Sequence, residues 1–351
     1  DVYKRQVRVA HAHHFARFVA DLSPAYHRRG QEVALRRTAA DYPNVRLALA
    51  TLAECGDADR HLAMTFGLLS FWAHQSMHLE GLQTCVRSLD IAVDETELLP
   101  QIKTAFVGAT CGAWTYRADA SDIATRCRVL AERLGDPRSI GWAELALAVV
   151  NGNDNGQPGT GTPNPNAVTT EHMQRAIDLW AAHPGPGWWD PAWERGLQQL
   201  CSSIFQPLAP ERLAEFNASR AAFESIGDQG WLAILYAQSL DFLEFAGPEF
   251  IGRVLDEGIE LAISPEWSNV ARYRRGVLHQ MRGDHQRAVD DLTTVIDYWK
   301  QFSDPYCTAE TRRLAVSHCK LGHAAQAGHL LESVFAAIDS GLDEYETFRT
   351  L

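Results

Sequence analysis

The sequence predicts an all-α fold, an α-solenoid built from antiparallel helix pairs. Apolar residues recur at the helical spacing i, i+3, i+4, i+7, capping signals mark helix starts and ends, and a pattern of small and apolar residues repeats along the chain. No window of β-branched residues alternates cleanly with polar ones, so strands are not expected. Representative apolar stripes are Phe15, Phe18, Val19 and Leu22; Leu292, Val295, Ile296 and Trp299; and Leu331, Val334, Phe335 and Ile338.

Helix starts are marked by a capping residue followed by proline, whose missing N–H is not needed in the first turn. This order occurs at Asp136-Pro137, Asp190-Pro191, Ser264-Pro265 and Asp304-Pro305. Helix ends are marked by glycine, which adopts the left-handed C-cap conformation at little cost. The marking glycines are Gly135, Gly227, Gly247, Gly283, Gly322 and Gly341. The stretches between them have the length of a helical hairpin.

One hairpin pattern recurs with a constant register near the C-terminus. In the clearest copy, Arg275 to Tyr298, Gly276 is expected where two helices approach, Gly283 at the turn and Ala288 beneath the first helix. Ala315, Gly322 and Ala327 follow 39 residues later in the same roles. The spacing resembles the tetratricopeptide repeat, which implies a right-handed superhelix. Weaker copies place the small residue at Gly81, Ala124, Ala176 and Gly252, with an ill-defined copy near Ala221.

A low-complexity segment interrupts the pattern. Residues 151–166 contain no large apolar side chain and are rich in Gly, Pro, Asn and Thr, so they are expected to form a flexible insertion. The predicted organisation has four parts: junction helices over 1–56, a first half of the repeats over 57–150, the insertion over 151–168, and a second half over 169–351.

Composition excludes several classes of protein. The 351 residues are 46% apolar and carry a net charge of −12, which repels a phosphate backbone and argues against direct nucleic-acid binding. No apolar run is long enough for a membrane span, and the first residues lack the charged, apolar, small-residue order of a signal peptide. The seven cysteines are scattered and never spaced C-x-x-C, so we expect buried thiols, no disulfide framework and a cytoplasmic location.

Motifs for catalysis or metal binding are not recognised. Gly156, Gly159 and Gly161 are followed by no Lys-Ser or Lys-Thr, and no G-x-S-x-G elbow occurs. His74 and His78 have the spacing of zinc ligands on one helix face, but Gln75 stands where a metalloprotease needs glutamate. We therefore expect no catalytic residue and no metal site in this chain.

Two groups of side chains are candidates for binding. Arg272, Arg274, Arg275, Arg282 and Arg287 form a basic cluster, interpreted either as a site for a phosphate or an acidic partner or as a solvated face paired with Asp284, Asp290 and Asp291. Ten tryptophans are present, and Trp188, Trp189 and Trp193 crowd together. Most are expected to pack in the core, although aromatic side chains in a groove can stack on a sugar, a peptide or a flat metabolite.

The repeat register also predicts which side chains face the concave groove of the solenoid. First helices line that groove in a helical-hairpin array. The candidate ligand or partner residues are Tyr116, Arg117, Trp142, Asp241, Glu244, Tyr273, Gln280 and Arg312.

The first hundred residues resemble the junction found in STAND-type ATPase regulators of the LuxR and antibiotic-regulator kind. The likeness lies in three segments, Ala10–Leu22, Asp41–Gly56 and Ala63–Leu89. A helix is expected to end before an N-x-R-x-A-L helix (Asn44, Arg46, Ala48, Leu49), and an F-W helix (Phe71, Trp72) leads to a repeat with Gly81 in place of alanine. Ala131–Ala148 is a further familiar stretch of such arrays, so the likeness covers nearly all of the chain.

This resemblance implies the sensor arm of a bacterial transcriptional regulator, with a protein partner or a small-molecule inducer in the groove. ATP and DNA binding would belong to modules outside this chain, because no Walker motif, winged helix or helix-turn-helix is present. The chain does not begin with Met and is expected to be a fragment needing no cofactor of its own. Two alternatives stay open: a free-standing helical-repeat scaffold, and the sensor arm of an adenylate-cyclase or kinase fusion. An enzyme using groove carboxylates is a third, disfavoured hypothesis.

Overall fold

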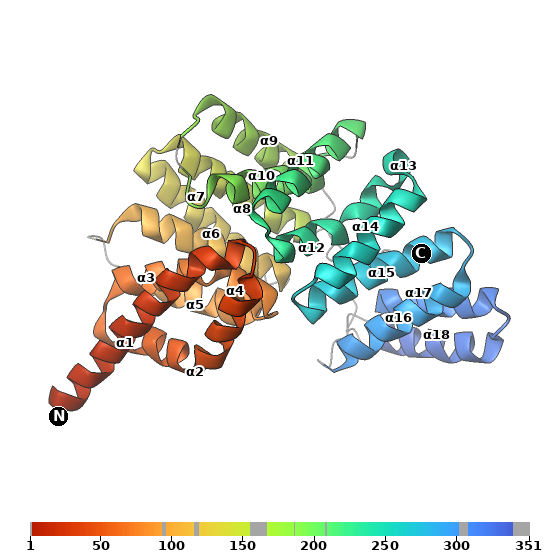
Figure 1. Ribbon diagram of the computed structural model, residues 1–351, viewed down its shortest axis with the longest axis horizontal. Helices are drawn as coiled ribbons and strands as arrows, with labels where there is room; N and C mark the ends of the chain where they lie inside the picture. The colour runs from red at the N-terminus through yellow and green to blue at the C-terminus, as the bar shows by residue number, and fades with distance from the viewer. Residues whose placement is uncertain are drawn as a thin grey trace. The chain divides into compact units, whose positions relative to one another are not determined.

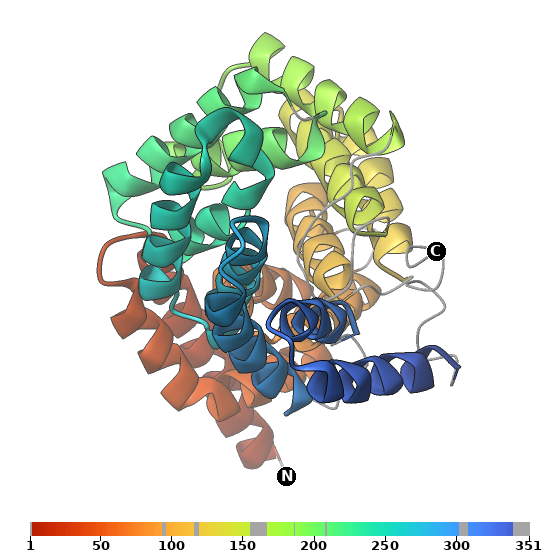
Figure 2. The same ribbon diagram turned by 90° about the vertical axis from the view of Figure 1, so that its right-hand side faces the viewer.

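The computed structural model describes residues 2–92, 96–115, 119–154, 167–185, 187–207, 209–301 and 308–339 (Figure 1). Within these ranges the chain forms eighteen α-helices and two short 3₁₀ helices, and it forms no strand. Consecutive helices pack against one another from α1–α2 to α10–α11 and again from α13–α14 to α17–α18 (Figures 1 and 2). The predicted fold class, an all-α array of antiparallel helix pairs, is confirmed.

The chain divides into two compact units, and the division falls inside α12 (Gln229–Ala237), between Trp231 and Leu232. Unit 1 holds the described residues up to Trp231. Its helices are α1 (Val2–Leu22), η1 (Ser23–His27), α2 (Gln31–Cys55), α3 (Ala58–Gly67), α4 (Leu69–His74), α5 (His78–Ile91), α6 (Leu98–Trp114), α7 (Asp119–Leu134), α8 (Pro137–Asp154), α9 (Ala167–Ala182), α10 (Pro191–Phe205) and α11 (Pro210–Ile226).

Unit 2 holds the described residues from Leu232 onward. After α12 it contains η2 (Ser239–Phe242), α13 (Leu243–Ala246), α14 (Pro248–Leu261), α15 (Pro265–Met281), α16 (His285–Lys300), α17 (Thr308–Lys320) and α18 (Ala324–Asp339). The predicted insertion lies largely outside the described residues, while α8 and α9 on either side of it pack against each other inside unit 1.

The predicted capping signals coincide with helix ends. α8, α10 and α15 begin at the expected prolines, and the preceding Asp136, Asp190 and Ser264 accept backbone hydrogen bonds from the first turn. The glycines at 135, 227, 247, 283 and 322 all have positive φ, as a C-cap requires. Asp304-Pro305 and Gly341 lie outside the described residues.

The predicted repeat register agrees with the packing of unit 2. A Cβ on Gly276 would lie 3.2 Å from Leu292 Cγ, so α15 and α16 approach closely at that position. Ala288 and Ala315 are fully buried, and Ala327 is 1% exposed. The core of this unit joins Tyr273, Val277, Leu292, Val295, Ile296 and Leu314.

Three local predictions are wrong. No helix ends before Asn44, because α2 runs unbroken through Pro43. His74 and His78 do not share a helix face, since His74 ends α4 and His78 begins α5. Ala221 is exposed. Ser219 is buried on the same helix instead, and its hydroxyl donates to the carbonyl of Gly196 at 2.8 Å.

The first and last segments of unit 1 are in direct contact. The N–H of Arg29 donates to the carbonyl of Ile226 at 3.0 Å, and the N–H of Gly230 donates to Gln31 Oε1 at 3.3 Å. The indole N–H of Trp231 donates to Ser70 Oγ at 3.4 Å. These contacts join residues about 160 to 200 positions apart, so the start of α2 and helix α4 are linked directly to the segment at the end of unit 1.

Candidate functional site

The inner helices of unit 1 carry a continuous group of aromatic side chains, which we call the aromatic cluster. The inner helices α3, α6, α8 and α10 contact one another in that order. Each of them contributes one ring, and the segment between α9 and α10 contributes two more. The cluster consists of Phe66, Phe106, Trp142, Trp188, Trp189 and Trp193.

Two pairs of rings in the cluster stack nearly in parallel. The ring centroids of Phe66 and Trp189 are 5.1 Å apart with an interplanar angle of 29°, and those of Trp142 and Trp188 are 5.4 Å apart at 27°. Trp142 and Trp193 are fully buried, whereas Phe66, Trp188 and Trp189 are half-buried. The cluster therefore has a buried base and a partly exposed outer layer.

Ion pairing and tight packing hold Trp188 and Trp189 in place. Glu194, 3% exposed, forms an ion pair with Arg138 of α8, and Arg138 also donates to the carbonyl of His183 at 3.2 Å. A Cβ on Gly187 would overlap the Glu194 carboxylate, so only glycine fits at this position. The chain before α10 is thus held at His183 by Arg138 and at Gly187 by close contact with Glu194.

The electrostatics of Glu194 reflect this enclosure. Burial raises the pKa of Glu194 above its usual value, and this effect exceeds the opposing influence of the Arg138 guanidinium and of the backbone N–H groups of Trp189 and Trp188. Glu194 Oε1 accepts from Arg138 and, at 3.4 Å, from Gln198 Nε2, while Oε2 is buried without a hydrogen-bond partner among the described residues. The carboxylate lies against Gly187, beside the two tryptophans.

One cation lies against the outer layer. The Lys103 ammonium on α6 is 5.0 Å from the ring centroid of Phe66 and 6.0 Å from that of Trp188. Burial lowers the pKa of Lys103, and the Glu194 carboxylate acts in the opposite direction. Among the described residues, Lys103 forms no ion pair or hydrogen bond with a carboxylate, so aromatic faces are its main neighbours.

The residues predicted for the groove fall into separate places. Trp142 is fully buried in the aromatic cluster and is not open to a ligand. Tyr116 and Arg117 lie outside the described residues. Glu244 is exposed on α13, and Arg312 is half-buried on α17. In unit 2 the structure brings together Tyr273 and Gln280, which both contact Arg313, whereas Asp241 pairs with Arg274.

These three side chains take part in internal hydrogen bonds. Arg274 donates to Asp241 Oδ1 at 2.8 Å, and Arg313 donates to the Tyr273 hydroxyl at 3.0 Å. Gln280 Nε2 donates to the carbonyl of Arg313 at 2.6 Å. Burial raises the pKa of Tyr273, so its hydroxyl is protonated at neutral pH. The contacts tie η2, α15 and α17 together, a structural role.

The basic cluster is paired with carboxylates, of which Asp284 and Asp291 were predicted, whereas Asp290 accepts a hydrogen bond from Gln286 instead. Arg275 forms ion pairs with Asp291 at 2.7 Å and with Asp256 at 2.6 Å. Arg287 pairs with Asp284 at 3.4 Å and Arg282 with Glu249 at 3.5 Å. Most of the positive charge of this cluster is therefore neutralised inside unit 2.

Buried thiols and imidazoles are kept uncharged. Burial raises the pKa of the Cys111 and Cys201 thiols to about 12, so both are protonated. Burial lowers the pKa of His74 to about 4, which leaves it neutral at pH 7. In the part of the chain that the structure describes, no three His, Cys, Asp or Glu side chains are grouped as metal ligands.

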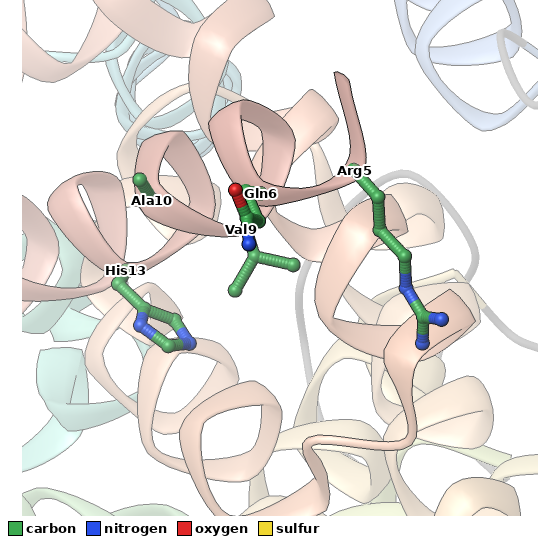
Figure 3. Close-up of a pocket in the computed structure, with 5 residues that line it drawn as sticks. All are labelled: Arg5, Gln6, Val9, Ala10 and His13. Carbon is green, nitrogen blue, oxygen red and sulfur yellow. The ribbon is translucent and has the colours of Figure 1, made fainter. Parts of the chain in front are cut away.

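A hollow on α1 is a weaker candidate for a site. It is lined by Arg5, Gln6, Val9, Ala10 and His13, all from this one helix (Figure 3). A ligand there would meet a single surface, and His13 is already paired with Asp57 at 3.3 Å. The aromatic cluster, with rings from four helices and a cation beside them, is the stronger site.

Comparisons with other proteins add no assignment. No model of a known protein family matches the chain, and no curated protein matches it. Among the described helices, none combines the length and apolarity needed to cross a bilayer.

Sequence reasoning drew attention to Trp188, Trp189 and Trp193 but missed Phe66, Lys103 and Glu194, whose spacing follows no motif. A sequence signal for Gly187 was its place in the Pro- and Gly-rich stretch before α10.

Proposed function

We propose that this chain is the ligand- or protein-binding repeat domain of a bacterial signal-responsive transcriptional regulator that acts in the cytoplasm. The observation that supports it is the aromatic cluster, in which successive inner helices each present a ring and Lys103 lies beside the exposed layer. Aromatic rings that remain half-buried at a helical-hairpin surface suit recognition. The motif resemblance to STAND-type regulators supplies the regulatory context.

The proposed mechanism is a change in how hairpins pack. Each helix pair of a solenoid buries its apolar face against its neighbours, so the interfaces between pairs set the geometry of the array. A ligand that touches several inner helices stabilises the arrangement it binds better. In this proposal the event controls an ATP-dependent switch in an upstream module, while this segment binds neither ATP nor DNA.

The upstream reading frame provides the first test. We expect it to encode G-x-x-x-x-G-K followed by Ser or Thr, and then a winged helix. An adenylate-cyclase or kinase module in that place would favour the fusion alternative, and a start codon immediately before this segment would favour the free-standing scaffold. Either result would contradict the proposal.

The second test uses the full-length protein. ATP hydrolysis and binding to its own promoter DNA are measured for the intact protein and for a form that lacks residues 1–351 of this chain. If the array restrains the switch, its removal changes both activities and abolishes their response to inducer. Equal activities in the two forms would contradict a sensor role.

A further inference from the structure

We propose that the outer layer of the aromatic cluster binds a planar aromatic carboxylate. Its ring would lie against Trp188, Trp189 and Phe66, and its carboxylate would pair with the Lys103 ammonium. This inference deepens the proposed function and rests on it, since it names the class of small molecule that the domain senses.

The case for a flat apolar ring comes from the geometry of the exposed side chains. Phe66 and Trp189 are stacked at 29°, and Trp188 continues a second stack onto Trp142 at 27°. Phe66, Trp188 and Trp189 are all half-buried, so part of each remains open to solvent. A planar group that lies against the exposed parts of these rings covers apolar surface.

The case for an anion comes from Lys103. Its ammonium is partly desolvated, lies over aromatic rings, and has no carboxylate partner among the described residues. The nearest carboxylate that influences it is Glu194, which is already paired with Arg138. A ligand carboxylate would therefore gain a charge-assisted contact without displacing an existing pair.

The polar groups around the cluster disfavour a sugar. A sugar buries many hydroxyl groups, each of which needs a hydrogen-bond partner. Here Arg138 pairs with Glu194 and donates to the carbonyl of His183, and the polar atoms of the cluster that lack a partner, Glu194 Oε2, Arg138 Nε and the indole N–H groups of Trp142 and Trp193, are buried away from the surface. Lys103 is left as the principal polar contact, which suits a ligand with one charged group on an apolar ring.

Three naphthalene probes of similar shape test the proposal. They are 1-naphthoate, 1-naphthamide and 1-naphthylmethylammonium, whose charges are negative, neutral and positive. Isothermal titration calorimetry on the intact chain should show naphthoate binding at least about tenfold more tightly than naphthamide, and the cation most weakly. Because the chain carries a net charge of −12, non-specific attraction would give the opposite order.

Matched variants locate the effect. Lys103→Met should reduce naphthoate affinity to that of naphthamide, whereas Lys103→Arg should retain the preference because it keeps the positive charge. Trp188→Leu should weaken binding of both probes. Lys300→Met is the control, because Lys300 is exposed on α16 of unit 2. Far-UV circular dichroism and melting curves check that each variant is folded.

Three results would overturn the inference: equal affinities of the wild-type chain for naphthoate and naphthamide, an unchanged preference in folded Lys103→Met, or no binding of any probe. The proposed function has its own readout, the response of the full-length protein to loss of the array. A failure of the ligand class is therefore distinguishable from a failure of the sensor role.

Discussion

The two units use the same helical hairpins but fill the space between inner helices differently. In unit 1 this space holds aromatic rings, and seven of the ten tryptophans (114, 142, 180, 188, 189, 193 and 231) form one connected set of ring contacts. In unit 2 it holds mainly aliphatic side chains together with Tyr273, bordered by arginine–carboxylate pairs such as Arg274 with Asp241 and Arg275 with Asp291.

The difference shows how each unit resists unfolding. Stacked rings bury large apolar areas and need few polar partners, so unit 1 depends on dispersion and water exclusion. The indole N–H groups of Trp142 and Trp193 are buried without an acceptor among the described residues. Packing, and not hydrogen bonding, is therefore what stabilises these two side chains in the folded state. Unit 2 adds arginine–carboxylate pairs to its core, and unit 1 has such pairs as well, among them Arg138–Glu194; the strength of these pairs varies with salt and pH.

The largest expected effect is the loss of a central ring from unit 1. Trp142 contacts Phe106, Trp180, Trp188 and Trp189, and it is fully buried. Trp142→Ala should lower the free energy of unfolding by about 4 kcal/mol, because a large cavity remains in a rigid cluster. Urea denaturation followed by circular dichroism measures this change.

Trp299→Ala in unit 2 is the matched control for that measurement. Trp299 is only half-buried at the edge of the unit 2 core. Its removal should cost less than half as much, because solvent already reaches the side chain. Equal costs for the two substitutions would show that the aromatic cluster carries no special share of the stability.

A smaller but more local effect is expected at segment 183–190. Gly187→Ala places a methyl group on the Glu194 carboxylate and should force Glu194 away from Arg138. We expect a loss of about 3 kcal/mol, typical of breaking a buried ion pair from one side. Tryptophan emission should shift to longer wavelength in the native state, because Trp188 and Trp189 become more exposed.

Gly185→Ala provides a control two residues away. Its Cβ would lie 3.8 Å from Arg138 Cδ, an ordinary contact. This variant should unfold like the wild type and keep its emission maximum. If both glycine variants behave alike, the fastening of the segment by Glu194 is not what positions the tryptophans.

Local signals made much of the fold predictable from the sequence. Pro137, Pro191 and Pro265 begin helices, and glycines with positive φ end them, because these choices depend on the backbone of one or two residues. The register around Gly276 was also predictable, because close helix approach excludes a side chain there. Pro43 misled the prediction, since α2 accommodates it in mid-helix.

The candidate site was less predictable for a physical reason. Phe66, Lys103 and Glu194 lie on three helices, and their meeting depends on how those helices pack, which no local spacing encodes. The groove assignment for Trp142 was wrong because segment 183–190 covers that face with its own tryptophans. The segment carries Gly187, whose need for glycine appears only when Glu194 is in place.

Acid should weaken unit 1 through His74. Burial lowers the pKa of His74 to about 4, with Asp228 acting in the opposite direction and His27 and His78 reinforcing the shift. Its ordinary value is 6.5, so the unfolded chain binds a proton near pH 6.5 that the folded chain binds only near pH 4. The stabilisation that neutral His74 provides is fully present above pH 6.5 and falls as the pH drops from 6.5 toward 4. At pH 5 the free energy of unfolding is expected to be lower by about 2 kcal/mol.

Denaturation of His74→Phe at several pH values checks this contribution. The substitution keeps an aromatic ring but removes the titration, so the dependence of stability on pH between 6.5 and 5 should become shallower. His329→Phe is the control, because His329 is exposed on α18. An unchanged slope in His74→Phe would show that other groups cause the acid sensitivity.

The smallest of these effects concerns the charge pairs of unit 2. Asp291 is 5% exposed and receives two hydrogen bonds from Arg275. Arg275→Met should cost about 1.5 kcal/mol, because it leaves this buried carboxylate without its bidentate partner. Arg287→Met should cost less than about 0.5 kcal/mol, since the Arg287–Asp284 pair is largely solvated.

Chemical denaturation in 0.05 and 0.5 M NaCl should increase the difference between the two variants. Added salt screens the exposed pair, while the cost of Arg275→Met changes little because solvent ions do not reach Asp291. Equal costs for the two variants would show that the buried Arg275–Asp291 pair stabilises unit 2 no more than the exposed Arg287–Asp284 pair does.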